Sequence, residues 1–147
     1  LNGGKCDVGI ESTIIDCSSA VPLILRPGAI TAEMLETSTG MYVSEDDLSK
    51  IRVSGGLDKH YAPRARVILD QIPQSGQGFI ALSNFSTPEG VIRIASPKDI
   101  VEFAQILYES LRKADLLELK EVVVTQPLGN GLALGVRDRL NKAAKGR

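Results

Sequence analysis

Residues 96–111 read SPKDIVEFAQILYESL, and this stretch gives the clearest indication of the fold. Its apolar residues follow the spacing that places side chains on one face of an α-helix. These residues are Ile100, Phe103, Ala104, Leu107 and Leu111. Ser96 is suited to cap the helix, and Pro97 is suited to its first turn. We therefore predict a long helix that begins at about Asp99 and buries one face.

The segments on either side of this helix indicate an α/β protein. Leu132, Val136 and Leu140 form a second helical stripe, with Arg137, Arg139 and Lys142 expected on other faces of the helix or toward its C-terminus, which favours positive charge. Short apolar runs typical of strands cover residues 66–72, 79–83, 91–95 and 121–125. Because strands that alternate with helices are typical of a parallel sheet, we predict a Rossmann-like fold for this part of the chain.

The beginning of the chain has a different pattern. From residue 7 to residue 28, apolar stretches separated by the turn-rich segment 18–22 predict a β-hairpin. Two short helices are predicted next. One follows Thr31, and the other begins at Ser44, which has Asp47 three residues later.

A glycine-containing segment separates these two patterns. Residues 54–59 read SGGLDK, and paired glycines lose the most conformational entropy when they become ordered. We therefore expect three parts: a β-rich segment over residues 1–50, a linker over 51–66, and the Rossmann-like domain over 67–147.

The charge and hydropathy of the chain argue against two kinds of partner. The 17 Lys and Arg residues nearly cancel the 18 Asp and Glu residues, so no strong overall field would attract nucleic acid or an anionic membrane. The longest apolar runs are too short to span a bilayer. We expect a cytoplasmic protein that makes no direct contact with nucleic acid or membrane.

The cysteines do not indicate a metal site. Cys6 and Cys17 form no CxxC pair, and His60 is the one histidine in the sequence. We expect both thiols to be reduced and partly buried, as is usual in cytosolic proteins, and we assign no metal ligand and no catalytic residue.

Three motifs occur in an order that is informative only when they are taken together. They are GIESTIID at residues 9–16, LRPGAI at 25–30 and HYAP at 60–63. In this order they resemble the YrdC family of threonylcarbamoyl-AMP synthases, in the longer branch whose linker carries His-Tyr-Ala-Pro and leads into a second α/β domain. The tail at 131–144 is similar to the end of that second domain. The resemblance implies that residues 1–50 are the carboxy-terminal, β-rich remnant of the family's YrdC-like α/β synthase domain.

The resemblance implies a nucleotidyltransferase reaction. Threonine and bicarbonate give a carbamate, whose oxygen attacks the α-phosphorus of ATP; pyrophosphate leaves and threonylcarbamoyl-AMP forms. Mg²⁺ accompanies the ATP, and a partner complex transfers the threonylcarbamoyl group to tRNA. Cations and hydrogen-bond donors are needed around the phosphate oxygens because charge develops there.

Three residues of this sequence match positions that hold substrates in the family. Arg26 is implied to bind ATP, since its planar fork can pair with phosphate oxygens and Pro27-Gly28 follows it. Ser12 is implied to hold threonine, and Tyr61 is implied to contact the nucleotide from the linker. Without the resemblance, Arg26 would suit a surface ion pair equally well and Ser12 would suit a half-buried strand.

Two departures from the family pattern limit what this chain is expected to do alone. The family linker reads Ser-Pro-Gly-Met before His-Tyr-Ala-Pro, whereas residues 54–57 are SGGL, which gives a looser hinge. The Lys-Arg and Ser-Ala-Asn segments that build most of the family's site have no counterpart, and the sequence starts at Leu1. We expect an upstream segment or a partner chain to supply them, and apolar surface to be exposed over residues 1–50.

Two features leave alternatives open. His60 is expected to bond to backbone rather than act as a general base, because the sequence places no Ser or Cys beside it. Gly129, Gly131 and Gly135 follow a strand and open a helix, where they could serve a tight turn or bind phosphate. The second possibility makes the later domain a regulatory module that binds a nucleotide or a partner and gates a catalytic domain; a third makes it a purely structural support for Tyr61.

Overall fold

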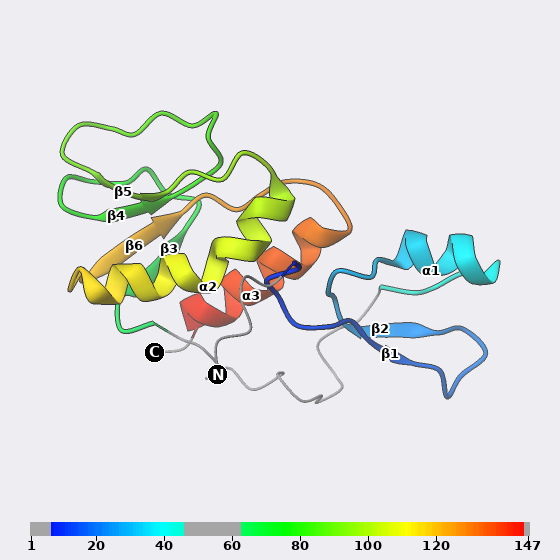
Figure 1. The fold of residues 1–147 in the computed structure, drawn as a ribbon. Helices are drawn as coiled ribbons and strands as arrows, with labels where there is room; N and C mark the ends of the chain where they lie inside the picture. The colour runs from blue at the N-terminus through cyan, green and yellow to red at the C-terminus, as the bar shows by residue number, and fades with distance from the viewer. Residues whose placement is uncertain (1–6, 46–62, 146–147) are drawn as a thin grey trace.

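The computed structural model describes residues 7–45 and 63–145, which fall into two parts. We call residues 7–45 the leading part and residues 63–145 the α/β domain. Figure 1 shows the leading part projecting to one side of the α/β domain, with its first segment running beside the two long helices. None of the helices among the described residues has the length and apolar character needed to cross a membrane.

The α/β domain is built on one parallel sheet, as predicted. The strands are β3 (Arg66–Leu69), β4 (Gly78–Ile80), β5 (Ile92–Ala95) and β6 (Glu121–Val124). They lie in the order β3-β6-β4-β5, and every neighbouring pair is parallel. The helices are α2 (Ile100–Leu116) and α3 (Leu132–Lys145). The alternation of strands and helices holds only from β5 onward, because β3, β4 and β5 follow one another without a helix between them.

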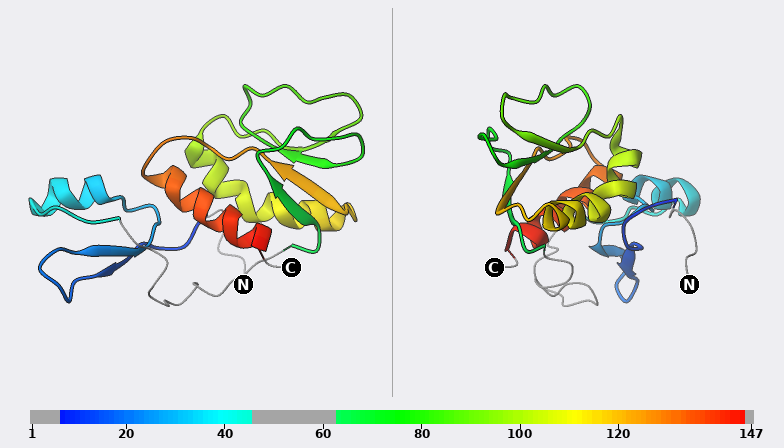
Figure 2. Two further views of the ribbon diagram at one scale, coloured as in Figure 1. Left: turned by 180° about the vertical axis from the view of Figure 1, so that it is seen from behind. Right: turned by 60° about the vertical axis from the view of Figure 1, so that its left-hand side comes forward.

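One face of the sheet and the two helices bury a common core. Val122 and Val124 of β6 point to this face, and α2 and α3 both pack against it. Figure 2 shows the two helices side by side on the same side of the strands. The helix residues of this core are Phe103, Ala104, Leu107, Leu111, Ala114, Val136 and Leu140. The periodicity of residues 100–111 therefore identified the buried face of α2 correctly.

The opposite face of the sheet has a smaller apolar cluster around Phe79 and Val123. The guanidinium of Arg93 lies over the Phe79 ring, 4.7 Å from its centroid. It also donates to the carbonyl oxygens of Ala81, Leu82 and Phe85. One arginine thus holds the long β4–β5 connection in place of the helix that strict alternation would require.

The N-terminus of α2 differs from the prediction. Asp99, not Ser96, is the capping residue: its side chain accepts from the Glu102 N–H at 2.8 Å, while Glu102 accepts from the Lys98 N–H. Ser96 comes directly after β5, and its hydroxyl accepts from Arg93 instead. The chain needs residues 96–98 to leave the sheet before the helix can begin.

The leading part contains the predicted hairpin and the first predicted helix. Strands β1 (Ile14–Asp16) and β2 (Leu23–Arg26) pair in antiparallel fashion. Helix α1 (Ala32–Thr39) is capped by Thr31, whose hydroxyl accepts from the Met34 N–H, and it contains no buried residue. Ser44 pairs with β2 as an isolated bridge, and the helix predicted from that position lies outside the described residues.

Candidate functional site

The hairpin brings Arg26 and Ser12 together. Arg26 is the last residue of β2, and its Nε donates to the Ser12 carbonyl oxygen at 3.0 Å. Its Nη2 also lies 3.3 Å from the Ser12 hydroxyl. Ser12 is exposed and Arg26 is half-buried, so both can be reached from solvent. These are the two described residues for which the sequence predicts substrate binding.

Ser12 borders a hollow of about 380 Å³ whose wall is mostly apolar. Thr13 is the other polar residue of this wall, and its hydroxyl donates to the Ile30 carbonyl oxygen at 2.6 Å. The apolar side chains around the hollow are Val8, Ile10, Ile15, Ala29 and Ile30. The hollow therefore offers a hydroxyl at the edge of an apolar surface.

Arg139 connects the hairpin segments to the α/β domain. Its Nε donates to Glu11 Oε2 at 2.7 Å, and its Nη1 donates to the Pro27 carbonyl oxygen at 2.7 Å. Tyr108, from α2, donates its hydroxyl to the same Glu11 carboxylate at 2.8 Å. The Arg139 side chain is only 4% exposed, so the prediction that it lies on an outer face of its helix is wrong. Asp138 provides a second carboxylate for it at 2.8 Å.

The charges in this cluster shift one another's titration. Burial works to raise the pKa of Glu11, but the hydrogen bonds from Arg139 and Tyr108 outweigh it and hold this pKa below its ordinary value. Burial and the neighbouring Glu11 carboxylate both raise the pKa of Tyr108. Burial works to lower the pKa of Arg139, and its bond to Glu11 raises it further than burial lowers it. At neutral pH the cluster is therefore an ion pair with a neutral tyrosine hydroxyl.

Three glycines allow the backbones to approach closely in this region. A Cβ on Gly9 would lie 2.2 Å from Gln105 Cα of α2. A Cβ on Gly28 would lie 2.5 Å from the Thr13 backbone nitrogen. A Cβ on Gly135 would lie 2.7 Å from Ile10 Cδ1, so the close-packing interpretation of this glycine agrees with its surroundings.

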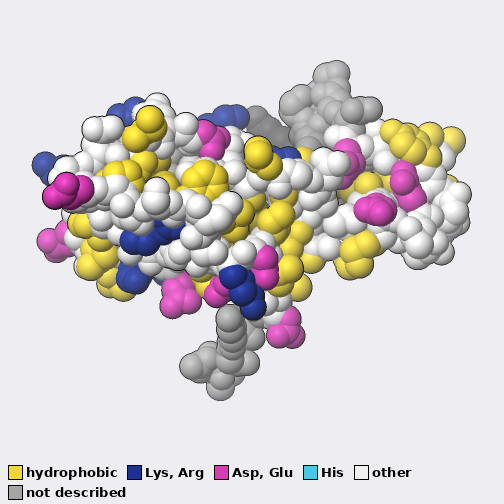
Figure 3. Space-filling model, turned by 90° about the horizontal axis from the view of Figure 1, so that it is seen from above, with side chains coloured by type: hydrophobic (Ala, Val, Ile, Leu, Met, Phe, Trp, Pro, Cys, Tyr) yellow, Lys and Arg dark blue, Asp and Glu magenta, His cyan; other side chains and the backbone are white. Residues whose placement is uncertain are grey.

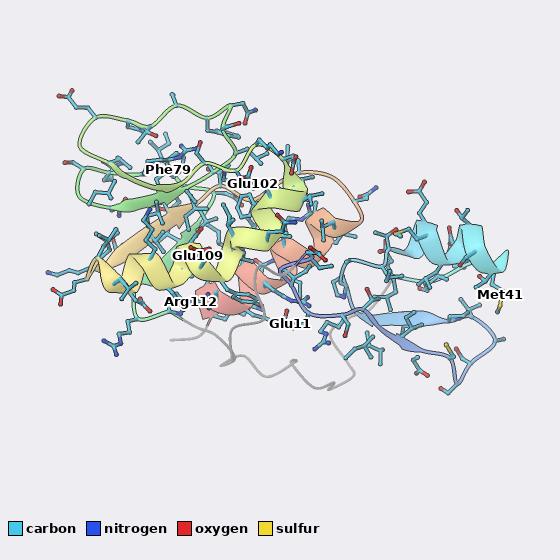
Figure 4. The ribbon with its side chains drawn as sticks, in the orientation of Figure 1. Glu11, Met41, Phe79, Glu102, Glu109 and Arg112 are labelled. Carbon is cyan, nitrogen blue, oxygen red and sulfur yellow. The ribbon has the colours of Figure 1, made fainter. Side chains whose placement is uncertain are left out.

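Figure 4 shows how the leading part is attached at one end. Glu11 lies where the leading segment passes beside the helices, whereas Met41 lies at the far end, away from the α/β domain. Sequence reasoning missed Glu11, Tyr108 and Arg139 as a group. One signal was present: Arg139 follows Val136 by three residues, which places it beside the apolar stripe of α3.

Three of the remaining predicted residues lie outside the described part of the chain: Tyr61, His60 and Cys6. Cys17 is a free, exposed thiol, so the expectation that it is partly buried is wrong. Over residues 7–45 and 63–145, no three His, Cys, Asp or Glu side chains are grouped closely enough to hold a metal ion.

Most of the chain matches a known protein family. The family model described as "Threonylcarbamoyl-AMP synthase, C-terminal domain" matches residues 30–145. The chain belongs to this family. The matched residues include α1 and the whole of the α/β domain that the structure describes.

Two curated relatives match nearly the whole chain. The threonylcarbamoyl-AMP synthase of Bacillus subtilis is 30% identical over an alignment that covers 100% of this chain and 49% of that protein. The synthase of Pyrococcus abyssi is 29% identical and is covered to 48%. The chain therefore spans about half the length of these members of the family.

A solved structure of the Pyrococcus abyssi protein, Sua5 complexed with L-threonine, is also similar to this chain. It is 25% identical and superimposes with a TM-score of 0.76, over 99% of this chain and 49% of that one. The similarity covers the leading part as well as the α/β domain.

Proposed function

We propose that this chain forms part of an L-threonylcarbamoyladenylate synthase, which makes threonylcarbamoyl-AMP and pyrophosphate from threonine, bicarbonate and ATP for the threonylcarbamoylation of tRNA adenosine. The observation that carries the proposal is the contact between Arg26 and Ser12 in a chain that belongs to the synthase family. The names of the curated relatives support the reaction, and the threonine complex of the Pyrococcus abyssi protein supports the amino-acid substrate.

In the proposed site, Arg26 binds the phosphates of ATP and Ser12 holds threonine. The 3.3 Å bond between Arg26 Nη2 and the Ser12 hydroxyl is the weaker of their two bonds, so a phosphate oxygen can replace it. The Ser12 hydroxyl would then be available to threonine, while the bond from Nε to the Ser12 carbonyl keeps the guanidinium in place. A charged fork next to the α-phosphate stabilises the negative charge that develops as the carbamate oxygen attacks.

Several features of the site are proposed to lie outside the described residues. Tyr61 contacts the nucleotide from the linker, and Mg²⁺ arrives with the ATP phosphates. Because this sequence has no counterpart of the family's Lys-Arg and Ser-Ala-Asn segments, we infer that the 147 residues do not catalyse the reaction alone. An upstream segment or a partner chain completes the site, and the product passes to a complex in the cytoplasm that modifies tRNA.

Isothermal titration with ATP tests the proposal. We expect saturable binding in the presence of Mg²⁺ that tightens when threonine is added. Arg26→Ala should weaken it at least about tenfold, since hydrogen bonds to charged groups contribute roughly 1.5–3 kcal/mol. Arg66→Ala is the matched control, because Arg66 is a 69% exposed arginine of the α/β domain that pairs only loosely with Glu121, at 3.7 Å.

The other outcomes of this titration point to different sites. Absence of ATP binding by the parent chain would contradict the role given to Arg26 within these residues and assign recognition to other segments. Binding that Arg26→Ala leaves unchanged would favour the regulatory alternative, with a nucleotide at the turn before α3. Gly129 and Gly131 have positive φ angles there, of 108° and 62°.

A further inference from the structure

The described residues contain a second connection between the substrate-binding segments, made from the α/β domain. Glu11 immediately precedes Ser12, and Pro27 immediately follows Arg26. Arg139 bonds to both of these neighbours at once, at 2.7 Å each, although it lies 128 and 112 residues away in the sequence. The two segments are thus joined twice: directly by the bond from Arg26 to Ser12, and one residue further along by Arg139.

We propose that Arg139 is a positioning residue that sets Arg26 against Ser12 from helix α3. What the positioned pair binds rests on the proposed function, but the positioning itself is a property of the free chain. Arg139 touches no substrate in this proposal. It adds a link from helix α3 to two strand-end segments that the hairpin and the bond from Thr13 to Ile30 also connect.

The chemistry of the contact favours arginine at this position. The planar guanidinium directs Nε and Nη1 at fixed angles, which lets one side chain bond to a carboxylate and to a backbone carbonyl at the same time. A lysine keeps the charge but has a single ammonium on a flexible stem, so it cannot reproduce both directions.

Neighbouring residues hold both Arg139 and its partner Glu11 in place. The Tyr108 hydroxyl lies 2.8 Å and 3.0 Å from the two oxygens of Glu11, so the carboxylate is held from α2 as well as from α3. Gly135, one turn before Arg139, lets α3 pack closely against Ile10, the residue before Glu11: a Cβ there would lie 2.7 Å from Ile10 Cδ1. A buried guanidinium with two carboxylate partners is costly to move, since its charge would lose compensation.

Nuclear magnetic resonance of the ¹⁵N-labelled chain tests this proposal without any ligand. The probe is the Nε–Hε signal of Arg26, which reports its bond to Ser12, together with the Ser12 amide signal. Arg139→Lys should shift or broaden both signals and should leave the methyl signals of Val122 and Val124 in the core unchanged. The matched control is Arg137→Lys on the same helix, whose Nη1 also donates to a proline carbonyl at 2.7 Å, but to Pro127 within the α/β domain.

A second variant keeps the test decisive if Arg139→Lys disturbs the core. Tyr108→Phe removes one donor to Glu11 and leaves the buried Arg139 in place, so it should move the Ser12 and Arg26 signals without moving the valine methyls. Unchanged Arg26 and Ser12 signals in a folded variant would overturn the proposal. Valine signals that move in both variants would also overturn it, because the cluster would then support the fold as a whole.

The nucleotide titration separates this inference from the proposed function. If the parent chain binds ATP, Arg139→Lys should weaken binding on the order of tenfold, because displacement of a binding group costs affinity without removing the group. If the parent chain binds no ATP, the proposed role of Arg26 fails alone, and the magnetic resonance result still decides whether Arg139 positions the pair.

Discussion

The leading part and the α/β domain differ in how completely they bury their apolar side chains. In the α/β domain, Phe103 and Leu107 are fully buried between the helices and the sheet. In the leading part, α1 has no buried residue, and a hollow of about 230 Å³ remains among apolar side chains of the hairpin and α1. Ile10 is the leading residue that enters the larger core, and it does so at the junction.

Both parts expose large hydrophobic side chains, and those of the α/β domain include Ile72, Leu116 and Leu128. Hydrophobic side chains reach the surface over α1 and the hairpin, as Figure 3 shows at the right of the molecule. The large ones are Val8, Val21, Ile30, Met34, Met41 and Tyr42. The exposed apolar surface expected for this part is therefore present. From this difference in burial we expect the α/β domain to fold on its own contacts and the leading part to depend on its contacts with α2 and α3.

Truncation of a core residue should affect the two parts differently, depending on which part contains the residue. Phe103→Ala should lower the free energy of unfolding by about 3–5 kcal/mol and should release the leading part too, since Phe103 belongs to the helix on which it rests. Ile24→Ala, at a residue that is 1% exposed, should cost about 2 kcal/mol and affect the leading part alone.

Hydrogen exchange measured segment by segment checks this pair of variants. With Ile24→Ala, peptides from residues 7–45 should lose protection while peptides from 63–145 keep theirs. Equal loss of protection in both parts would mean that the molecule is one cooperative unit, and the contrast drawn above would be wrong.

The sequence predicted features that depend on neighbouring residues and missed features that depend on distant ones. Local signals were sufficient for α2, the hairpin and the Thr31 cap, because periodicity and capping depend on residues a few positions apart. They could not give the strand order, which places β6 between β3 and β4. Nor could they pair Glu11 with Arg139 across 128 residues, since one sequence does not show which residue bonds to a buried arginine.

The candidate site includes only residues for which the resemblance supplied motifs, and their roles stay a prediction. Ser12 and Arg26 belong to segments that match the family pattern, and the hairpin brings them together. The residues that hold those segments from the other domain lie in helices whose sequence indicated only amphipathic packing. The position of Arg139 beside the apolar stripe of α3 is the physical signal that would have indicated its burial, although it does not identify the partner.

A methyl group added where Gly9 packs against α2 should have the next largest effect on stability. Gly9→Ala places a Cβ 2.2 Å from Gln105 Cα and 2.3 Å from the Ala104 carbonyl oxygen, at a φ of 81°. Overpacking and left-handed strain together should cost about 2–4 kcal/mol, and the leading part should detach from α2. Gly40→Ala is the control, because its φ is similar, at 70°, and no atom lies within 4 Å of the new Cβ; it should cost only about 1 kcal/mol. Urea denaturation measures both, and equal costs would show that no tight contact exists at Gly9.

The smallest expected effect is a change in the pH dependence of stability from Glu11→Gln. The pKa of Glu11 is lower in the folded chain than its ordinary value of 4.5, so the charged form stabilises the fold. That stabilisation is complete above pH 4.5 and is lost as the pH falls through the lower, folded pKa. A glutamine still accepts hydrogen bonds from Arg139 and Tyr108, but it carries no charge. The free energy of unfolding of the variant should therefore be lower by about 1 kcal/mol at neutral pH and should decrease less as the pH falls.

Denaturation midpoints measured from pH 7 down to pH 3 check this prediction, with Glu109→Gln as the control. Glu109 is an exposed glutamate that follows Tyr108 on α2, and its replacement removes the same charge without touching the junction. The difference between the two variants should shrink toward low pH, because the parent Glu11 then becomes neutral as well. If it stayed constant across this range, the ion pair with Arg139 would not be what attaches the leading part, and the glycine contacts of Gly9 and Gly135 would carry the junction instead.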